Sequence, residues 1–112
     1  MALPAAARAE AIAILERYCN ARASDARRLE HRERGNSITL LERRPPWQPD
    51  ADPAWSTLDV VQFRYDTGTA LWSLSWPRAS GRWERYDDIE PAPSIATLLA
   101  EVDADPDGVF WG

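Results

Sequence analysis

Apolar residues recur at three- and four-residue steps near both ends of the chain, which is the spacing of a helix with one buried face. Near the start, this spacing predicts a helix over residues 4–22, with a proline in its first turn. Near the end, it predicts a second helix, which begins after Ser94 and ends at Asp105-Pro106.

The stretch RRLEHRERGNSITLLERR, residues 27–44, predicts two strands joined by a tight turn. Gly35-Asn36 suits a two-residue turn with glycine first, and this register pairs Arg34 with Ser37. Because side chains alternate between the two faces of a strand, one face of the hairpin is apolar. The other face is charged and polar and carries Glu30, Arg32, Arg34, Thr39 and Arg43.

Three further segments alternate between apolar and polar positions and predict further strands: DVVQFRYD, LWSLSW and RWERY. In the last segment, the turn register leaves open whether Trp83 or Tyr86 faces the core. The expected fold class is α+β, with an N-terminal helix, about five antiparallel strands in hairpins and a C-terminal helix. We expect helices to cover one face of the sheet, and 112 residues fit a single domain, 1–112.

Two features of the composition exclude several kinds of catalysis. The chain has no lysine, which removes Schiff-base chemistry and a phosphate-loop lysine. It has one histidine, His31, and one cysteine, Cys19, too few for a zinc site of cysteine and histidine ligands within one chain. We therefore expect no cofactor, and binding is favoured over catalysis.

The features that bear on location point to the cytoplasm. A single cysteine excludes an internal disulfide and fits a reducing compartment. The stretch MALPAAARAE lacks the long apolar run of a secretory signal, and no apolar run approaches the length of a membrane span. We expect a cytoplasmic protein without membrane contact.

Charge is distributed unevenly along the chain. Residues 1–44 hold nine arginines and six acidic residues, a balance of +3, whereas residues 45–112 hold four and twelve, a balance of −8. A basic front half can indicate an anionic partner, but pairing between the two halves of the chain is the favoured interpretation. Because the net charge is −5, nucleic acid is not the favoured partner, and a protein partner stays open.

Arginine and tryptophan side chains supply the candidate binding residues. The segment ERRPPW, residues 42–47, predicts the end of a strand, because proline cannot donate to a β-ladder. Exposed arginines and aromatic rings can contact anionic or stacked ligands, although packing is the alternative role for each tryptophan. The candidates are Arg32, Arg34, Arg43, Arg44, Trp47, Arg64 and Trp83.

Two acidic segments are weaker candidates for a metal. Glu84, Asp87 and Asp88 could hold a metal for hydrolysis if their carboxylates converged, but an exposed acidic loop is the favoured interpretation. DADPDG, residues 103–108, matches the first half of a calcium-binding loop, which also requires a glutamate at position 12. Because this chain lacks that glutamate, we expect the segment to end a helix rather than to bind calcium.

Five segments, ERRPPW, QFRYD, LWSLSW, GRWERYDD and DPDGVFWG, occur in an order and spacing that resemble a small bacterial family catalogued as domain of unknown function 3024. The resemblance extends from the first helix to Gly112. It implies a bacterial origin and no established activity, and it supplies no catalytic residues.

Three classes of function follow from these features. The favoured class is a non-enzymatic interaction or accessory domain. The alternative is a weak binder of single-stranded nucleic acid or nucleotides that uses an arginine-rich sheet face, which requires those arginines to form one patch. The second alternative is a metal-dependent hydrolase that uses carboxylates.

Overall fold

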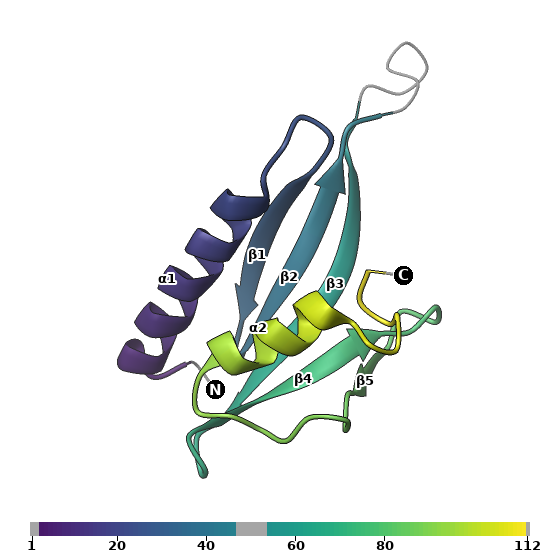
Figure 1. Cartoon of the computed structure of the whole chain (residues 1–112). Coiled ribbons are helices and arrows are strands. Elements are labelled where there is room, and N and C mark those ends of the chain that lie inside the picture. Colours follow the sequence, from purple (N-terminus) through teal and green to yellow (C-terminus); the bar gives the residue numbers. More distant parts are fainter. Residues whose placement is uncertain (1–2, 47–53, 112) are drawn as a thin grey trace.

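The computed structural model describes residues 3–46 and 54–111 of the chain. In these residues, one helix precedes five antiparallel strands and a second helix follows them, which confirms the predicted α+β class (Figure 1). The elements are α1 (Ala5–Arg22), β1 (Arg28–Arg34), β2 (Ser37–Arg44), β3 (Ser56–Asp66), β4 (Leu71–Pro77), β5 (Trp83–Arg85) and α2 (Ile95–Ala104).

The strands form one sheet in which each strand pairs with the next one in the sequence. β2 pairs with β3 across the long connection between them, so the hairpins predicted from the sequence join into one continuous meander. A register shift between Leu40 and Leu41 marks a bulge in this pairing. β1 and β5 are the two edges of the sheet, and β5 is only three residues long.

The turn between β1 and β2 has the predicted register, with Arg34 opposite Ser37. Gly35 has a φ of 58°, a conformation that glycine adopts without steric cost. Asn36 also ties this turn to the end of β3. Its Nδ2 donates a hydrogen bond to the Tyr65 carbonyl at 2.8 Å, and the Tyr65 amide donates to the Asn36 carbonyl at 2.9 Å.

The hydrophobic core lies between the two helices and one face of the sheet. In Figure 1, α2 crosses in front of the sheet and α1 runs beside β1. Leu15 of α1 and Leu98 of α2 belong to one buried cluster with Phe63 of β3, and all three are fully buried. Tyr86, the residue after β5, is also buried in this core, so the residue of the last segment that faces inward is Tyr86 rather than Trp83.

The opposite face of the sheet, called the outer face below, is not covered by α1 or α2. Small polar side chains are nevertheless buried there, because longer side chains stand on both sides of them. Ser37, for example, lies between Arg34 of β1 and Arg64 of β3. The buried polar residues of the outer face are Ser37, Thr39, Gln62 and Ser75.

The segment after α2 is held to the core by the carboxylate of Asp105. This residue is left-handed, with φ 41° and ψ 56°, and its carboxylate accepts hydrogen bonds from the amides of Phe110 at 3.1 Å and Trp111 at 2.9 Å. Phe110 is buried against the ring of Tyr86, with 5.0 Å between the ring centroids. The predicted end of the helix at Asp105 is confirmed, and Asp105 also positions the chain that follows.

Candidate functional site

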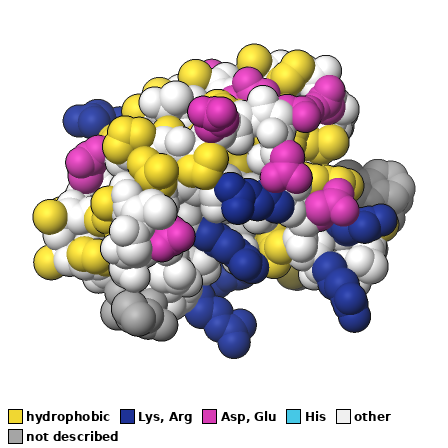
Figure 2. Space-filling view, turned by 90° about the horizontal axis from the view of Figure 1, so that it is seen from below, with side chains coloured by type: hydrophobic (Ala, Val, Ile, Leu, Met, Phe, Trp, Pro, Cys, Tyr) yellow, Lys and Arg dark blue, Asp and Glu magenta, His cyan; other side chains and the backbone are white. Residues whose placement is uncertain are grey.

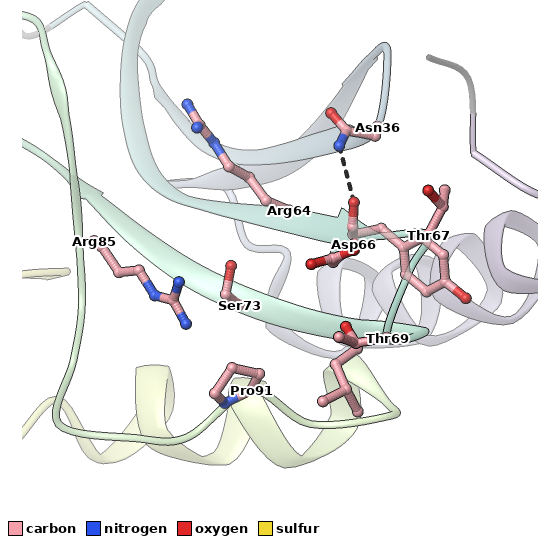
Figure 3. Close-up of a pocket in the computed structure, with 10 residues that line it drawn as sticks. Asn36, Arg64, Asp66, Thr67, Thr69, Ser73, Arg85 and Pro91 are labelled. Atoms are coloured by element: carbon pink, nitrogen blue, oxygen red, sulfur yellow. Dashed lines mark hydrogen bonds between the residues drawn. The ribbon is translucent and has the colours of Figure 1, made fainter.

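An open cleft lies at the end of the outer face where β3 turns into β4 (Figure 3). Its volume is about 400 Å³, and its walls come from the β1–β2 turn, β3, β4, β5 and the segment before α2. Six of the polar residues that line it are Asn36, Arg64, Asp66, Thr69, Ser73 and Arg85.

Two arginines reach the cleft from the strands on either side of β4. Arg64 of β3 lies opposite Ser73 of β4, and its Nε donates to Gln62 Oε1 at 2.7 Å. Arg64 forms no ion pair with any residue that the structure describes. The Arg85 Nε lies 3.6 Å from Asp87 Oδ1, and because both side chains are largely exposed, this pair is weak.

Asp66 is the acidic residue of the cleft, and it also shapes the turn between β3 and β4. Its Oδ1 accepts a hydrogen bond from the Gly68 amide at 2.8 Å, and its carbonyl accepts one from the Ala70 amide at 2.8 Å. Ala70 is left-handed, with a φ of 58°. One Asp66 oxygen is thus engaged by the turn, and its single negative charge offsets only part of the charge of the two arginines.

Arg32 and Arg34 lie on the outer face, as predicted from alternation. Arg34 lies in the same row as Ser37 and Arg64 and has no ion pair among the described residues. Arg32 is less available, because its guanidinium lies 3.4 Å from the Asp59 carboxylate. Figure 2, which views the molecule from below, shows arginine side chains gathered in the middle and lower part of the surface.

The structure separates Arg43 and Arg44 from each other. Arg43 points to the outer face, where its guanidinium lies 3.7 Å from Glu30 and its buried Nε has no hydrogen-bond partner among the described residues. Arg44 points the other way, and its Nε lies 2.6 Å from Glu42. Glu42 is only 3% exposed and also contacts Arg27 at 3.3 Å, so Arg44 belongs to a structural charge cluster rather than to the outer face.

The structure describes only one of the two candidate tryptophans, Trp83. Trp83 lies opposite Pro77 at the edge of the outer face and is half-buried. Trp47 lies outside the described residues. Trp55, a third tryptophan that the sequence leaves free to bind or to pack, stacks under Arg28, with 4.6 Å between the guanidinium carbon and the ring centroid.

Ion pairs between the two halves of the chain neutralise little of the net positive charge of residues 1–44. Among the described residues, only two of the eight ion pairs join the two halves of the chain: Arg22 with Asp103, and Arg32 with Asp59. The other six pairs lie within one half. Pairing between the halves therefore engages Arg32 of the outer face but not Arg34.

The three acidic candidates for a metal do not come together. Glu84 lies 3.1 Å from the guanidinium of Arg78, and Asp87 is the partner of Arg85. Asp88 lies beside Asp107, and a hydrogen bond with that carboxyl raises the pKa of Asp88. Within residues 3–46 and 54–111, no three ligand-type side chains gather in a way that could hold a metal ion.

The acidic residues of the DADPDG segment have separate structural roles. Asp103 accepts hydrogen bonds from the Tyr18 hydroxyl and from Arg22, each at 2.7 Å, and these bonds lower the pKa of Asp103, with Tyr18 as the main cause. Asp105 accepts from two backbone amides, and Asp107 accepts from the Tyr86 hydroxyl at 3.3 Å. A calcium ion would have to displace these contacts.

We expect calcium to leave the stability unchanged. Adding about 1 mM calcium should shift the melting temperature by less than about 1 °C relative to the same sample with chelator. A site with a dissociation constant of about 10 μM would add about 2.7 kcal/mol at that concentration, which would appear as a shift of several degrees. Magnesium at the same concentration controls for ionic strength, and a shift specific to calcium would contradict this prediction.

Sequence reasoning did not single out Arg85, Ser73 or Asn36 as site residues. Arg85 reaches the cleft because Ser75 lies opposite it, which places both residues on the outer face. The alternation of LWSLSW predicts that Ser73 and Ser75 face away from the core, but only the pairing of β4 with β5 shows that Arg85 shares their face. Asn36 lines the cleft because the β1–β2 turn is bonded to β3.

These features define a small α+β protein whose five-stranded antiparallel meander has helices on one face and a polar, arginine-bearing outer face. A family model described as "Domain of unknown function (DUF3024)" matches residues 3–112, and the chain belongs to this family. No curated protein and no solved structure matches the chain. Neither helix in the described part of the chain has the length and hydropathy needed to cross a membrane.

Proposed function

We propose that the protein is a non-catalytic interaction domain that binds an extended acidic segment of a partner protein on the outer face of its sheet. The observation that carries this proposal is the presence of arginines without carboxylate partners on a face that the helices leave open. Arg34 and Arg64 stand there on either side of Ser37. The guanidinium of an arginine offers paired donors in a planar fork, which matches the two oxygens of a carboxylate.

The chemistry of the outer face favours a peptide over single-stranded nucleic acid. Its central positions carry hydroxyl and amide side chains rather than aromatic rings, whereas proteins that bind single strands stack bases on aromatic side chains. The described tryptophans near this face stand at its margins: Trp83 at the β5 edge, and Trp55 at the start of β3, where it stacks with Arg28. The net charge of −5 also opposes the approach of a long polyanion more than that of a short acidic segment.

The side chains that most often act as nucleophile or base are poorly placed for catalysis. Cys19 is buried on α1, and desolvation raises the pKa of its thiol to about 11, so the thiol is protonated at neutral pH. His31 is half-buried and has no hydrogen bond to the described residues that would orient it as a base. A binding role is therefore the simpler account of the outer face.

The proposal predicts salt-sensitive binding of an acidic peptide. The probe is a fluorescent peptide of about eight residues with glutamate at alternate positions, long enough to cross five strands spaced about 4.8 Å apart. Fluorescence anisotropy should show binding that weakens as salt rises, and the matched peptide with glutamine in place of glutamate should bind at least about tenfold more weakly, which corresponds to about 1.4 kcal/mol.

Charge reversal on the outer face should abolish this binding. The double variant Arg34→Glu/Arg64→Glu tests the face, and Arg17→Glu/Arg82→Glu is the control with the same change in net charge, because Arg17 and Arg82 are exposed and have no ion pair among the described residues. Equal loss in the control would show an unspecific charge effect and contradict the proposal. Tighter binding of a single-stranded oligonucleotide than of the peptide would favour the nucleic-acid class instead.

A further inference from the structure

We propose that the cleft at the end of the outer face is a binding site for a single carboxylate, which Arg64 and Arg85 hold between them. The inference rests on the proposed function in one respect, since the carboxylate would belong to the acidic segment of the partner. It goes further by assigning two residues and one ligand group to one place. In Figure 3, Arg85 extends toward Ser73 in the wall of the cleft, whereas Arg64 comes from the neighbouring strand with its guanidinium directed away from Ser73, so a shared ligand requires Arg64 to turn toward the cleft.

The positions of the two arginines suit a shared ligand. β3 and β5 lie on either side of β4 and are therefore about 10 Å apart. Arg64 lies opposite Ser73 and Arg85 lies opposite Ser75, so the two arginines are offset by two residues along β4. Two arginine side chains can span that distance from both sides. Ser73, the β4 residue opposite Arg64, contributes a hydroxyl to the same cleft and can donate to a bound oxygen.

Each arginine is available to a ligand at little cost. The Nε of Arg64 donates to Gln62 at 2.7 Å, and when the side chain turns into the cleft, this partly buried hydrogen bond is exchanged for one to the ligand. Arg85 has only the long contact of 3.6 Å to Asp87, and the Asp87 side chain is 83% exposed. An exposed pair of this kind contributes little, so a ligand carboxylate can replace Asp87.

The charge of the cleft favours a monoanion. Two arginines bring two positive charges, and Asp66, which lines the same cleft, brings one negative charge. The remaining charge of +1 is balanced by one carboxylate, whereas a doubly charged phosphate would leave the cleft with a net negative charge. The second Asp66 oxygen is not bonded to the turn, and its negative charge disfavours ligands that place further negative charge close to it.

The test uses short peptides and NMR on the whole chain. The probe is acetyl-Gly-Glu-Gly-amide, and the matched control is acetyl-Gly-Gln-Gly-amide at the same ionic strength. We expect the glutamate peptide to shift the amide signals of Thr69, Ser73 and Arg85 in a saturable way, with a dissociation constant on the order of 1 mM. Equal shifts with both peptides, or shifts spread over the whole sheet, would overturn the inference.

Two variants test whether peptide binding depends on the cleft or on exposed arginines in general. Arg85→Gln should weaken binding of the glutamate peptide by at least about tenfold, because it removes one of two charged hydrogen-bonding groups. Arg82→Gln makes the same change at an exposed arginine that does not line the cleft and has no ion pair among the described residues, so binding should stay unchanged. Thermal unfolding of both variants verifies that they are folded, and equal binding by the two would refute the assignment.

Two outcomes distinguish this inference from the proposed function. If the long acidic peptide binds the outer face but the short peptide does not shift the cleft signals, the carboxylate site is wrong and the binding face stands. If the short peptide binds in the cleft but the long peptide does not bind, the interaction domain is wrong and the site stands. Inorganic phosphate is a third probe, and tighter binding of phosphate than of the glutamate peptide would overturn the preference for a carboxylate.

Discussion

Replacing Asp105 by alanine is expected to lower the free energy of unfolding by about 2–4 kcal/mol. The carboxylate accepts hydrogen bonds from the amides of Phe110 and Trp111, and because both bonds are only partly buried, each contributes about 0.5–1 kcal/mol. Alanine would also have to occupy the left-handed conformation that Asp105 adopts, which costs about 1–2 kcal/mol for an ordinary residue. Chemical denaturation measures the loss.

Asparagine at the same position is the matched control. Asp105→Asn keeps a residue that tolerates the left-handed conformation and keeps one carbonyl acceptor, so we expect it to lose about half as much stability as Asp105→Ala. The indole signal of Trp111, whose Nε1 donates to the Val102 carbonyl at 3.0 Å, reports whether the segment after α2 stays in place. An unchanged stability in Asp105→Ala would show that other contacts hold this segment.

Replacing Phe63 by alanine is expected to cost about 3–5 kcal/mol, the range for removing a packed aromatic ring from a core. Phe63 is fully buried on β3, between Ile38 of β2 and Leu74 of β4. A domain of this size has a total stability of about 5–15 kcal/mol, so this variant should be close to unfolding at moderate temperature.

The neighbouring residue provides the contrast. Arg64 follows Phe63 on the same strand but faces outward, so Arg64→Ala should change the stability by no more than about 0.5 kcal/mol. Urea denaturation of the two variants tests the alternation of β3 directly. If Arg64→Ala were as destabilising as Phe63→Ala, the outer face would be part of a second core rather than an open binding surface.

The parts of the fold that local rules govern could be predicted from the sequence. Gly35-Asn36 fixed the register of the first hairpin, since a two-residue turn leaves one way to pair the strands, and Arg34 does lie opposite Ser37. Ser94 caps α2 with a hydrogen bond of 3.2 Å from the Ala96 amide, as a serine before an apolar repeat predicts.

Other parts depend on contacts between distant segments, which a single sequence does not display. β3 begins at Ser56, whereas the alternation of apolar and polar residues predicted a start near Asp59. The first residues of β3 do not alternate as those of a half-buried strand do, and they belong to the strand because they pair with the end of β2. The bulge between Leu40 and Leu41 lets Val60 and Val61 both enter the core, and no residue of that stretch is a turn former that would reveal it.

The candidate site was predictable only in part for the same reason. Arg34 and Arg64 could be assigned to the polar face, because strong apolar neighbours such as Phe63 define the alternation of their strands. Arg85 could not, because β5 has three residues and its face depends on the turn that precedes it. The three acidic metal candidates do not converge, because each carboxyl group contacts a different side chain, as Glu84 contacts Arg78.

The two edges of the sheet have a consequence for how the protein behaves at high concentration. An edge strand offers unpaired backbone groups to which another chain can add, and long, flat, apolar edges lead to aggregation. β1 reads RLEHRER, so a second chain that paired with it would have to bring its strand alongside a row of charges, and β5 is too short to support a ladder. The sheet therefore resists growth in either direction, and the molecule should remain free of fibrils at concentrations where an uncharged edge would assemble.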